Sequence, residues 1–327
     1  MVDRSSGSED DAVDPLSGVL DAVRLRGSVF GAGELGAPWG VQTPGIPEIV
    51  CYVVVRGAAH LALLDASRAQ VAIASGDVVL VEAGRAHALR DSPSSVAVSF
   101  DELRRAAGDE LRRAAGDGPG PLRWGGPGPR TTLVCGSLAV DEAGRALLGS
   151  ALSGFLHLPA ETAGPGLLGV LSALASEVAA PRPGSRAALT RLAELVFIHA
   201  LRASIARGAA GAGWLKGLGH PSIARALAAI HADPGAPWTV DTLAGRAGMS
   251  RSAFAAEFRR HVGEPPLAHV TAWRMRHAAR LLEDGRLSLK DIAAKVGYGS
   301  DEAFNRVFKG WAGVPPGEYR RRAPVPR

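Results

Sequence analysis

The strongest constraint on the fold of this 327-residue chain is a motif that occurs twice near its C-terminal end. The first copy spans residues 243–266 and the second spans residues 292–316. An internal repeat of this kind indicates one supersecondary unit that is used twice. The offset is 49 residues up to the turn and 50 after an extra Gly299, and the matched pairs are Leu243/Ile292, Gly248/Gly297, Met249/Tyr298, Ser250/Ser300, Phe254/Phe304, Phe258/Phe308, Gly263/Gly313 and Pro265/Pro315.

Each copy predicts two helices joined by a tight turn. Gly248 ends the first helix of copy one, because a close helix–helix turn needs a residue that tolerates positive φ. Ser250 caps the next helix, in which Phe254 and Phe258 are four residues apart and therefore share one buried face. This arrangement is typical of a helix-turn-helix, whose second helix enters the major groove of DNA.

The outward residues of each second helix are the candidate DNA contacts. Arginine recognises guanine and asparagine recognises adenine through paired hydrogen bonds, which favours Asn305 and Arg306 in copy two. Acids in the first helical turn suit the helix dipole and repel phosphate. Copy one begins with Arg251 and is the expected stronger base reader. The predicted DNA-binding residues are Arg251, Ser252, Ala253, Ala256, Glu257, Arg259, Arg260, Ser300, Asp301, Glu302, Asn305, Arg306 and Lys309.

Charge is concentrated in the same part of the chain. Residues 214–327 contain 18 Lys/Arg against 10 Asp/Glu, a net charge of +8, and the remaining residues carry a net charge of −3. A basic module on an acidic remainder favours a polyanion partner. We expect Arg259, Arg260 and Lys309 to lie along the phosphates, where they contribute affinity rather than sequence choice.

A long helix is expected over residues 268–283, between the two copies. It would hold the two units at a fixed distance, so that they meet successive major grooves about 34 Å apart. The sequence leaves two roles open for Arg274, Arg276 and Arg280, which either contact the DNA backbone or solvate the outer face of this helix.

The N-terminal part has a different sequence pattern. A short helix is expected over residues 14–24, and short β-rich runs follow from about residue 26 to residue 100, separated by Gly, Pro, Ser and Asp. Runs of this length and spacing indicate an antiparallel barrel or sandwich. The predicted fold is therefore α+β, with an N-terminal antiparallel β-barrel and helices followed by an all-α domain of two helix-turn-helix units and a long connecting helix.

Two apolar helices are predicted after the barrel, over residues 166–180 and 185–206. The sequence leaves open whether they pack on the barrel or pair with a second subunit in a homodimer. No apolar run reaches the roughly 18 to 20 residues that a bilayer requires, and the acidic N-terminus lacks the apolar segment of a signal peptide, so we expect a cytoplasmic protein without membrane contact. The predicted organisation is a disordered tail at 1–13, a sensor and dimerisation domain at 14–207 with a flexible insertion at 101–130, a linker at 208–220 and a DNA-binding domain at 221–323.

The tandem units and their ending GYGSDEAFNRVFKGWAGVPPGEYR resemble the DNA-binding domain of the AraC/XylS family of transcription regulators. The resemblance implies promoter DNA and RNA polymerase as partners, activation of transcription, and a small-molecule or stress signal. Asn305 differs from the family signature, which often has serine at this position. The matching residues are Gly297, Tyr298, Ser300, Phe304, Arg306, Phe308, Lys309, Gly313, Pro316, Tyr319 and Arg320.

The segment from Gly76 to His87 resembles the second motif of cupin barrels, with Glu82 in the place of a usual proline. This leaves a cupin-type enzyme with an added nucleic-acid-binding domain as an alternative. His60 and His87 are the only histidines of the barrel region and do not fill a three- or four-ligand metal site, so no metal, cofactor or catalytic residue is predicted. Together with Cys51 they are instead the candidate effector contacts.

A thiol-based redox sensor is a further alternative. The chain has two cysteines, Cys51 and Cys135. The barrel-like part resembles the cupin-type sensor domain found in one branch of the AraC/XylS family, and that branch includes members with reactive cysteines. A sensor thiol should be exposed and near positive charge, whereas both cysteines lie in apolar runs.

Overall fold

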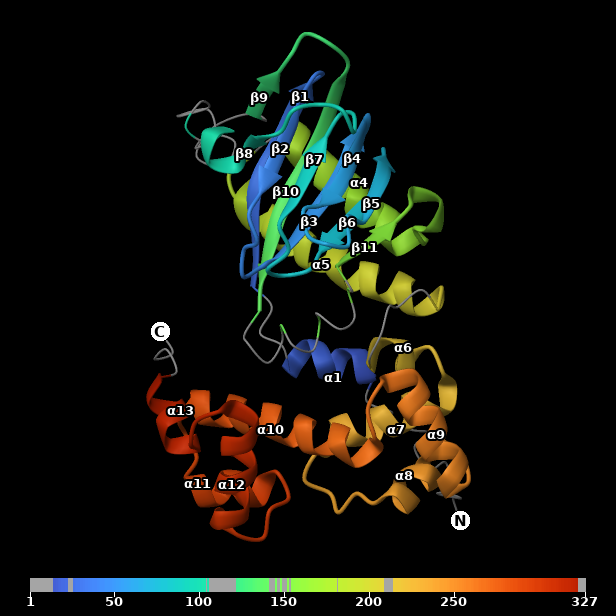
Figure 1. Ribbon diagram of the computed structural model, residues 1–327, viewed down its shortest axis with the longest axis vertical. Helices are drawn as coiled ribbons and strands as arrows, with labels where there is room; N and C mark the ends of the chain where they lie inside the picture. The colour runs from blue at the N-terminus through green and yellow to red at the C-terminus, as the bar shows by residue number, and fades with distance from the viewer. Residues whose placement is uncertain are drawn as a thin grey trace, which may run out of the picture. The chain divides into compact units, whose positions relative to one another are not determined.

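The computed structural model describes residues 14–22, 26–103, 105, 122–140, 145, 148, 152, 154–180, 182–208 and 214–322. The chain forms two compact units, one from Arg24–Ala212 and the other from Met1–Val23 together with Gly213–Arg327 (Figure 1). The tail predicted at 1–13 and most of the predicted insertion lie outside the described residues. Among the helices that the structure describes, none combines the length and the apolar character needed to cross a bilayer.

Eleven described strands build the unit Arg24–Ala212, which we call the sensor unit. Their bounds are β1 (Arg26–Gly36), β2 (Gly40–Thr43), β3 (Ile49–Arg56), β4 (Ala58–Leu63), β5 (Gln70–Ala74), β6 (Val78–Val81), β7 (His87–Arg90), β8 (Val98–Ser99), β9 (Leu122–Gly125), β10 (Arg130–Ala139) and β11 (Phe155–Leu158). One sheet has the order β11-β6-β3-β10-β1-β9, and the other has the order β5-β4-β7-β2-β8.

The α+β class is confirmed, but the prediction of an antiparallel β-barrel is wrong, and the described strands agree with the alternative of a sandwich. The described strands form two separate sheets, in which β11, β9, β5 and β8 remain as edges. Two pairs, β1 with β9 and β2 with β8, are parallel. Apolar runs in a sequence do not encode strand direction, and an edge strand as short as the two-residue β8 has too few backbone groups to extend a ladder into the other sheet.

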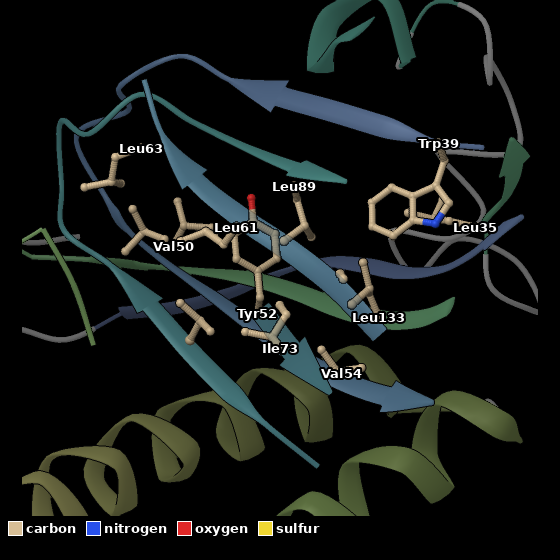
Figure 2. Close-up of a cluster of buried hydrophobic side chains, with 13 residues drawn as sticks. Leu35, Trp39, Val50, Tyr52, Val54, Leu61, Leu63, Ile73, Leu89 and Leu133 are labelled. Atoms are coloured by element: carbon tan, nitrogen blue, oxygen red, sulfur yellow. The ribbon is translucent and has the colours of Figure 1, made fainter. Parts of the chain in front are cut away.

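The core of the sensor unit lies between the two sheets (Figure 2). Trp39, Tyr52, Leu61 and Ile73 from both sheets are buried there. β3 is buried on both faces, which explains its continuous apolar run, because the opposite face is covered by α4 (Pro165–Ala179) and α5 (Ser185–Ala206). The two apolar helices therefore take the first of the roles that the sequence left open and pack on the sheet. A single-turn helix, η2 (Ala160–Thr162), precedes them.

The other unit, which we call the helical unit, contains both copies of the repeat. The helix α10 lies between the two copies, as predicted (Figure 1). The bounds are α1 (Pro15–Ala22), α6 (Trp214–Leu218), α7 (Pro221–Ala232), α8 (Val240–Ala247), α9 (Arg251–Val262), α10 (Pro266–Asp284), α11 (Leu289–Lys295), α12 (Asp301–Ala312) and α13 (Pro316–Arg322).

Two segments of the helical unit differ from the predicted organisation. The stretch 208–220 was expected to be a linker, yet it contains α6, in which Trp214 and Leu215 are buried. The predicted N-terminal helix forms as α1, but it packs against α7 and α10 of the helical unit. Gly18 allows this close approach, since a Cβ at that position would lie 3.3 Å from the Cβ of His231.

Candidate nucleic-acid interface

Both copies of the repeat form the predicted helix, glycine turn and capped helix. Gly248 and Gly297 adopt φ values of 68° and 80°, in the left-handed region that favours glycine. Ser250 accepts a hydrogen bond from the backbone N–H of Ala253, and Ser300 accepts one from the backbone of the matching third residue of α12. These caps satisfy donors that would otherwise be free at the starts of α9 and α12.

A pair of phenylalanines anchors each second helix. Phe254 and Phe258 of α9 are fully buried with ring centroids 5.5 Å apart, and Phe304 and Phe308 of α12 are fully buried at 5.6 Å. Replacing one such ring by alanine typically costs about 3–5 kcal/mol. The inner faces fix the orientation of α9 and α12, so the opposite faces are held outward.

The outer face of α9 carries most of the predicted contacts of copy one. Two of its three exposed arginines are engaged: Arg251 Nη1 lies 2.6 Å from an Asp241 carboxylate oxygen, and Arg260 pairs with Glu257. The Glu257 side chain is half-buried, and the hydrogen bond from Arg260 lowers its pKa. The exposed predicted residues of α9 are Arg251, Ser252, Ala253, Ala256, Arg259 and Arg260.

The outer face of α12 is different. Arg306 and Lys309 are exposed, and neither has an ion-pair partner among the residues that the structure describes. Asn305 is half-buried one position earlier. Asp301 and Glu302 occupy the first turn, where their charges favour the positive end of the helix dipole, as predicted.

Two arginines that the sequence did not rank among its sites hold the turns in place. Arg225 of α7 donates hydrogen bonds to the backbone carbonyls of Arg246 and Ala247, at distances of 3.3 and 2.7 Å, and thereby caps the end of α8 beside the first turn. Arg274 of α10 stands at the same 49-residue offset and approaches the second turn at Gly297. Extending the repeat upstream to the preceding helices was the signal that could have found this pair.

Arg274 also joins the loop that precedes copy one to the turn of copy two. Its guanidinium donates to the carbonyl oxygens of Pro234 and Ala236, each at 2.7 Å, and it lies 5.8 Å from the ring centroid of Tyr298. The loop between α7 and α8 is thereby fastened to the turn of copy two. We call this contact the inter-copy brace, and it consists of residues 233–238, Arg274 and Gly297.

The role that the sequence left open for the arginines of α10 is now defined for two of them. Arg274 belongs to the inter-copy brace. Arg276 has buried Nε and Nη1 atoms with no hydrogen-bond partner among the described residues, and burial lowers its pKa although the carboxylate of Glu264 partly opposes this effect. Neither guanidinium lies on an open outer face.

The three candidate effector residues are not brought together in the sensor unit. His87 faces the inter-sheet core, where its Nε2 accepts a hydrogen bond from the Tyr52 hydroxyl at 2.8 Å and its Nδ1–H donates to the carbonyl of Arg85. Burial lowers the pKa of His87. His60 alternates with the inward residues of β4 and is half-buried on the opposite face. Cys51 faces the helices α4 and α5.

The two cysteines also lie on opposite faces of one sheet. Cys135 is paired with Tyr52 across β10 and β3 and packs on the inter-sheet core, whereas Cys51 is paired with Gly136 and faces the helices. Burial raises the pKa of each thiol to about 12. A disulfide between them would require the strands to unpair, and thiols with such a pKa are poor nucleophiles.

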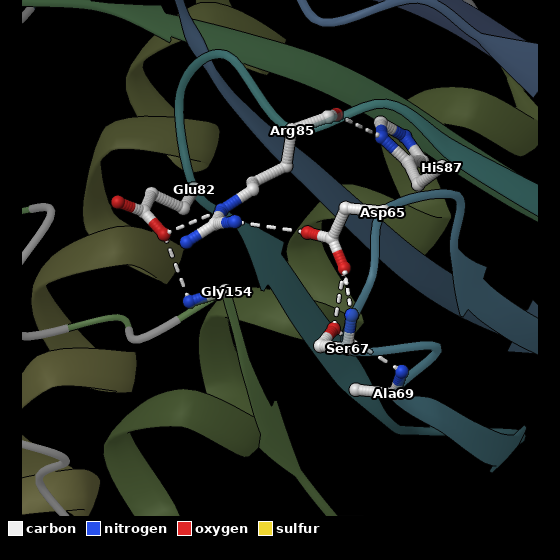
Figure 3. Close-up of polar contacts among 7 residues, drawn as sticks. All are labelled: Asp65, Ser67, Ala69, Glu82, Arg85, His87 and Gly154. Atoms are coloured by element: carbon white, nitrogen blue, oxygen red, sulfur yellow. Dashed lines mark hydrogen bonds and ion pairs between the residues drawn. The ribbon is translucent and has the colours of Figure 1, made fainter.

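The segment predicted to form a cupin motif has the expected turns. Gly76 and Gly84 have positive φ on either side of β6. Figure 3 shows how Glu82, which replaces the usual proline, accepts hydrogen bonds from the backbone N–H of Gly154 at 2.9 Å and from Arg85 at 3.0 Å. Arg85 also forms an ion pair with Asp65, in which its Nη1 lies 2.9 Å from a carboxylate oxygen. Glu82 therefore fastens the approach to β11, a role that proline cannot provide.

Comparisons with known proteins agree with both parts of this description. A cupin family model matches residues 14–206, and a helix-turn-helix domain model matches residues 243–322. A putative AraC-like transcription regulator of Streptomyces lividans is 33% identical over 96% of this chain and 100% of its own length. The chain belongs to the AraC-like family of DNA-binding transcription regulators.

Two further similarities are more local. The RCS-specific HTH-type transcriptional activator RclR of Escherichia coli (strain K12) is 32% identical over 59% of this chain and 68% of its own length. The DNA-binding domain of AdpA, solved in complex with a target DNA, is 34% identical, covers 31% of this chain and 90% of its own, and superposes with a TM-score of 0.30.

Two residues of the AraC-like signature have a structural role in this regulator. The Tyr319 ring packs edge-on against the Phe308 ring, and its hydroxyl donates to Glu283 at 3.3 Å. Arg320 donates to the carbonyl of Leu287 at 2.7 Å. The end of the signature therefore ties α13 to α12 and to the end of α10, whereas Arg306 and Lys309 point outward.

Proposed function

We propose that this AraC-like regulator activates transcription from promoters that it recognises through the outer faces of α9 and α12. The observation that carries the proposal is the contrast between the two faces of each helix, since buried phenylalanines hold the inner face and basic residues cover the outer one. Arg306 is the proposed base reader of α12, beside Asn305, and Lys309, Arg259 and Arg260 are the proposed phosphate contacts.

The proposed signal is a small molecule bound by the sensor unit. A cavity of about 190 Å³ is lined by Pro47, Ile49, Glu82, Ala83, Gly84, Arg145 and Leu152. Ordinary drug-sized sites have volumes of roughly 300–1,000 Å³, so this cavity suits a smaller ligand. A carboxylate and a guanidinium at its wall favour a polar one. His87 begins β7, directly after the loop that follows Glu82, and is the proposed link from this cavity to the core.

The proposed regulator also contacts RNA polymerase and forms a homodimer through α4 and α5. Leu168 of α4 and Leu195 of α5 remain 49% and 42% exposed after both helices have packed on the sheet, and they offer an apolar surface to a second copy. Replacing both leucines by glutamate should shift the molecular mass in solution from dimer to monomer. An unchanged mass would contradict this part of the proposal.

The function is tested by mapping bound promoters and reconstituting transcription on them. Purified protein and RNA polymerase should produce more transcript than polymerase alone, and Arg306→Ala should remove the gain. Repression of the same promoters would contradict activation while leaving DNA recognition intact. Absence of any preferred DNA site would contradict the proposal as a whole.

A further inference from the structure

Three side chains that can bind a metal meet at the junction of α7 and α9. His220 precedes α7, and Glu257 and His261 stand one turn apart on α9. One ligand atom from each residue lies within 4.8 Å of the others, and all three residues are half-buried. Bound Zn²⁺ would need these atoms about 3.4 Å apart in a tetrahedral site, which side-chain rotation can supply. The sequence did not predict this site, because His220 comes from a distant segment.

The donors of this cluster already share one cation. The Arg260 guanidinium, which can only donate, forms hydrogen bonds with a Glu257 carboxylate oxygen and with His261 Nε2 at 2.9 Å. Since Nε2 accepts, its lone pair points toward the Arg260 guanidinium, and the Glu257 carboxylate lies 3.3 Å from the same nitrogen. An imidazole lone pair and a carboxylate directed at one point form a cation site, and the 64% exposed Arg260 side chain occupies that point.

His220 can complete the site at small cost. Its ring centroid lies 4.7 Å from that of His261. Its Nδ1 accepts a hydrogen bond from the backbone N–H of Ile223 at 3.4 Å, a length near the limit for such bonds. Metal binding through either ring nitrogen of His220 would remove this weak contact. Two imidazoles and one carboxylate leave a fourth position for water, which is a frequent zinc arrangement.

We propose that His220, Glu257 and His261 bind a divalent transition-metal ion of the zinc type. The ion displaces Arg260 from Glu257 and fastens the start of α7 to α9. This part of the proposal does not depend on DNA binding. A consequence that does rest on the proposed function is that the released Arg260 becomes available to phosphate, so that zinc and DNA should each increase the affinity of the other by the same factor.

The experiment titrates the full chain with ZnCl₂ against a chromogenic chelator. One zinc ion per chain is expected to bind, and His220→Gln and His261→Gln should each weaken binding at least tenfold. His277→Gln is the matched control, because His277 is a half-buried histidine of the same unit outside the cluster, and it should bind as the parent does. Equal zinc affinity in the parent and both cluster variants would overturn the site, as would the absence of zinc binding.

A second variant keeps the test decisive if the histidine variants unfold. Arg260→Ala removes the competing guanidinium without removing a ligand, so zinc should bind at least threefold more tightly. Unchanged or weaker binding in this folded variant would overturn the proposal. Gel-shift titrations with and without ZnCl₂ then test the coupling between zinc and DNA separately. If zinc binds but the DNA affinity is unchanged, the coupling is rejected and the zinc site stands.

Discussion

The two copies of the repeat share their inner faces and differ on their outer faces. In each copy, two buried phenylalanines, a capping serine and a glycine with positive φ occur at matching positions. On the outside, two of the three arginines of α9, Arg251 and Arg260, are held by acidic partners, whereas Arg306, the one arginine of α12, has none among the described residues. The features that the two copies share are therefore those that their fold requires, and the copies differ on their outer faces.

The turns differ as well. A Cβ added at Gly248 would find its nearest contact at 3.4 Å, in the guanidinium of Arg225. A Cβ added at Gly297 would lie 2.5 Å from the carbonyl oxygen of Gly235 and 2.9 Å from Arg274. Copy two is thus supported by the loop that precedes copy one, and the inter-copy brace leaves no space for a side chain.

The largest expected effect tests this difference in the turns. Gly248→Ala should cost about 1–2 kcal/mol of stability, because alanine resists positive φ. Gly297→Ala carries the same backbone cost and in addition drives a methyl group into a backbone carbonyl, so we expect a cost about 2 kcal/mol larger. Urea unfolding of both full-length variants, followed by helical circular dichroism, measures it. Equal urea midpoints for the two variants would show that the inter-copy brace shifts to accommodate the added methyl group at little cost.

The second effect concerns base reading. Arg306→Ala should weaken binding to the preferred DNA site by about 1–3 kcal/mol and relax the preference at one base pair. Arg251→Ala should cost less, since DNA must first compete with Asp241 for this side chain. Titration of both variants on the same operator, with single-base substitutions, separates them. A larger loss for Arg251→Ala would restore copy one as the stronger reader, which is what the sequence predicted.

A smaller effect is expected for the phosphate contacts. Lys309→Ala should weaken binding to all DNA sequences alike and reduce the slope of log affinity against log salt by about 1. Arg260→Ala should change the slope less at the same ionic strengths, because the pairing with Glu257 already neutralises its charge. Sequence-dependent losses for Lys309→Ala would mean that it reads bases.

The smallest expected effect on DNA affinity comes from releasing Arg251 of copy one from its ion pair. Asp241→Asn frees Arg251 from an exposed ion pair whose value is at most about 1 kcal/mol, so DNA binding should tighten by no more than that. The same change removes an acid from the first turn of α8 and should lower stability by about 0.3–1 kcal/mol. Weaker DNA binding at unchanged helical content would indicate that Asp241 positions Arg251 for the DNA.

Features that depend on neighbouring residues could be predicted from the sequence. The helix predicted over 185–206 is α5, and Gly248 and Ser250 end and begin helices as expected, because apolar spacing, caps and turn glycines act over a few residues. Features set by distant partners could not be predicted. The parallel pairing of β9 with β1 depends on pairing between distant segments of the chain, which apolar spacing does not record.

The candidate site divides in the same way. The outward positions of α9 and α12 follow from helical spacing, and the structure leaves most of them exposed, although Glu257 and Asn305 are half-buried. The ion pair between Arg251 and Asp241 and the cluster around His220 join different elements, so the sequence could not connect their members. The sequence also predicted a surface role for Arg274 of α10. The hydrogen-bond partners of Arg274, the carbonyls of Pro234 and Ala236, lie about 40 residues earlier in the loop between α7 and α8 and could not be connected with it from the sequence.

The packing of α1 has a consequence for dissecting the protein. The sensor unit is topologically an insertion within the helical unit, because residues on both sides of it, Met1–Val23 and Gly213–Arg327, form one compact body. Leu16 and Val19 of α1 are 4% and 0% exposed, and burial of such side chains contributes about 1.5–3 kcal/mol each. A fragment that begins at α6 would lose this helix and expose apolar surface, so fusing residues 14–22 back onto it should recover solubility and heat resistance.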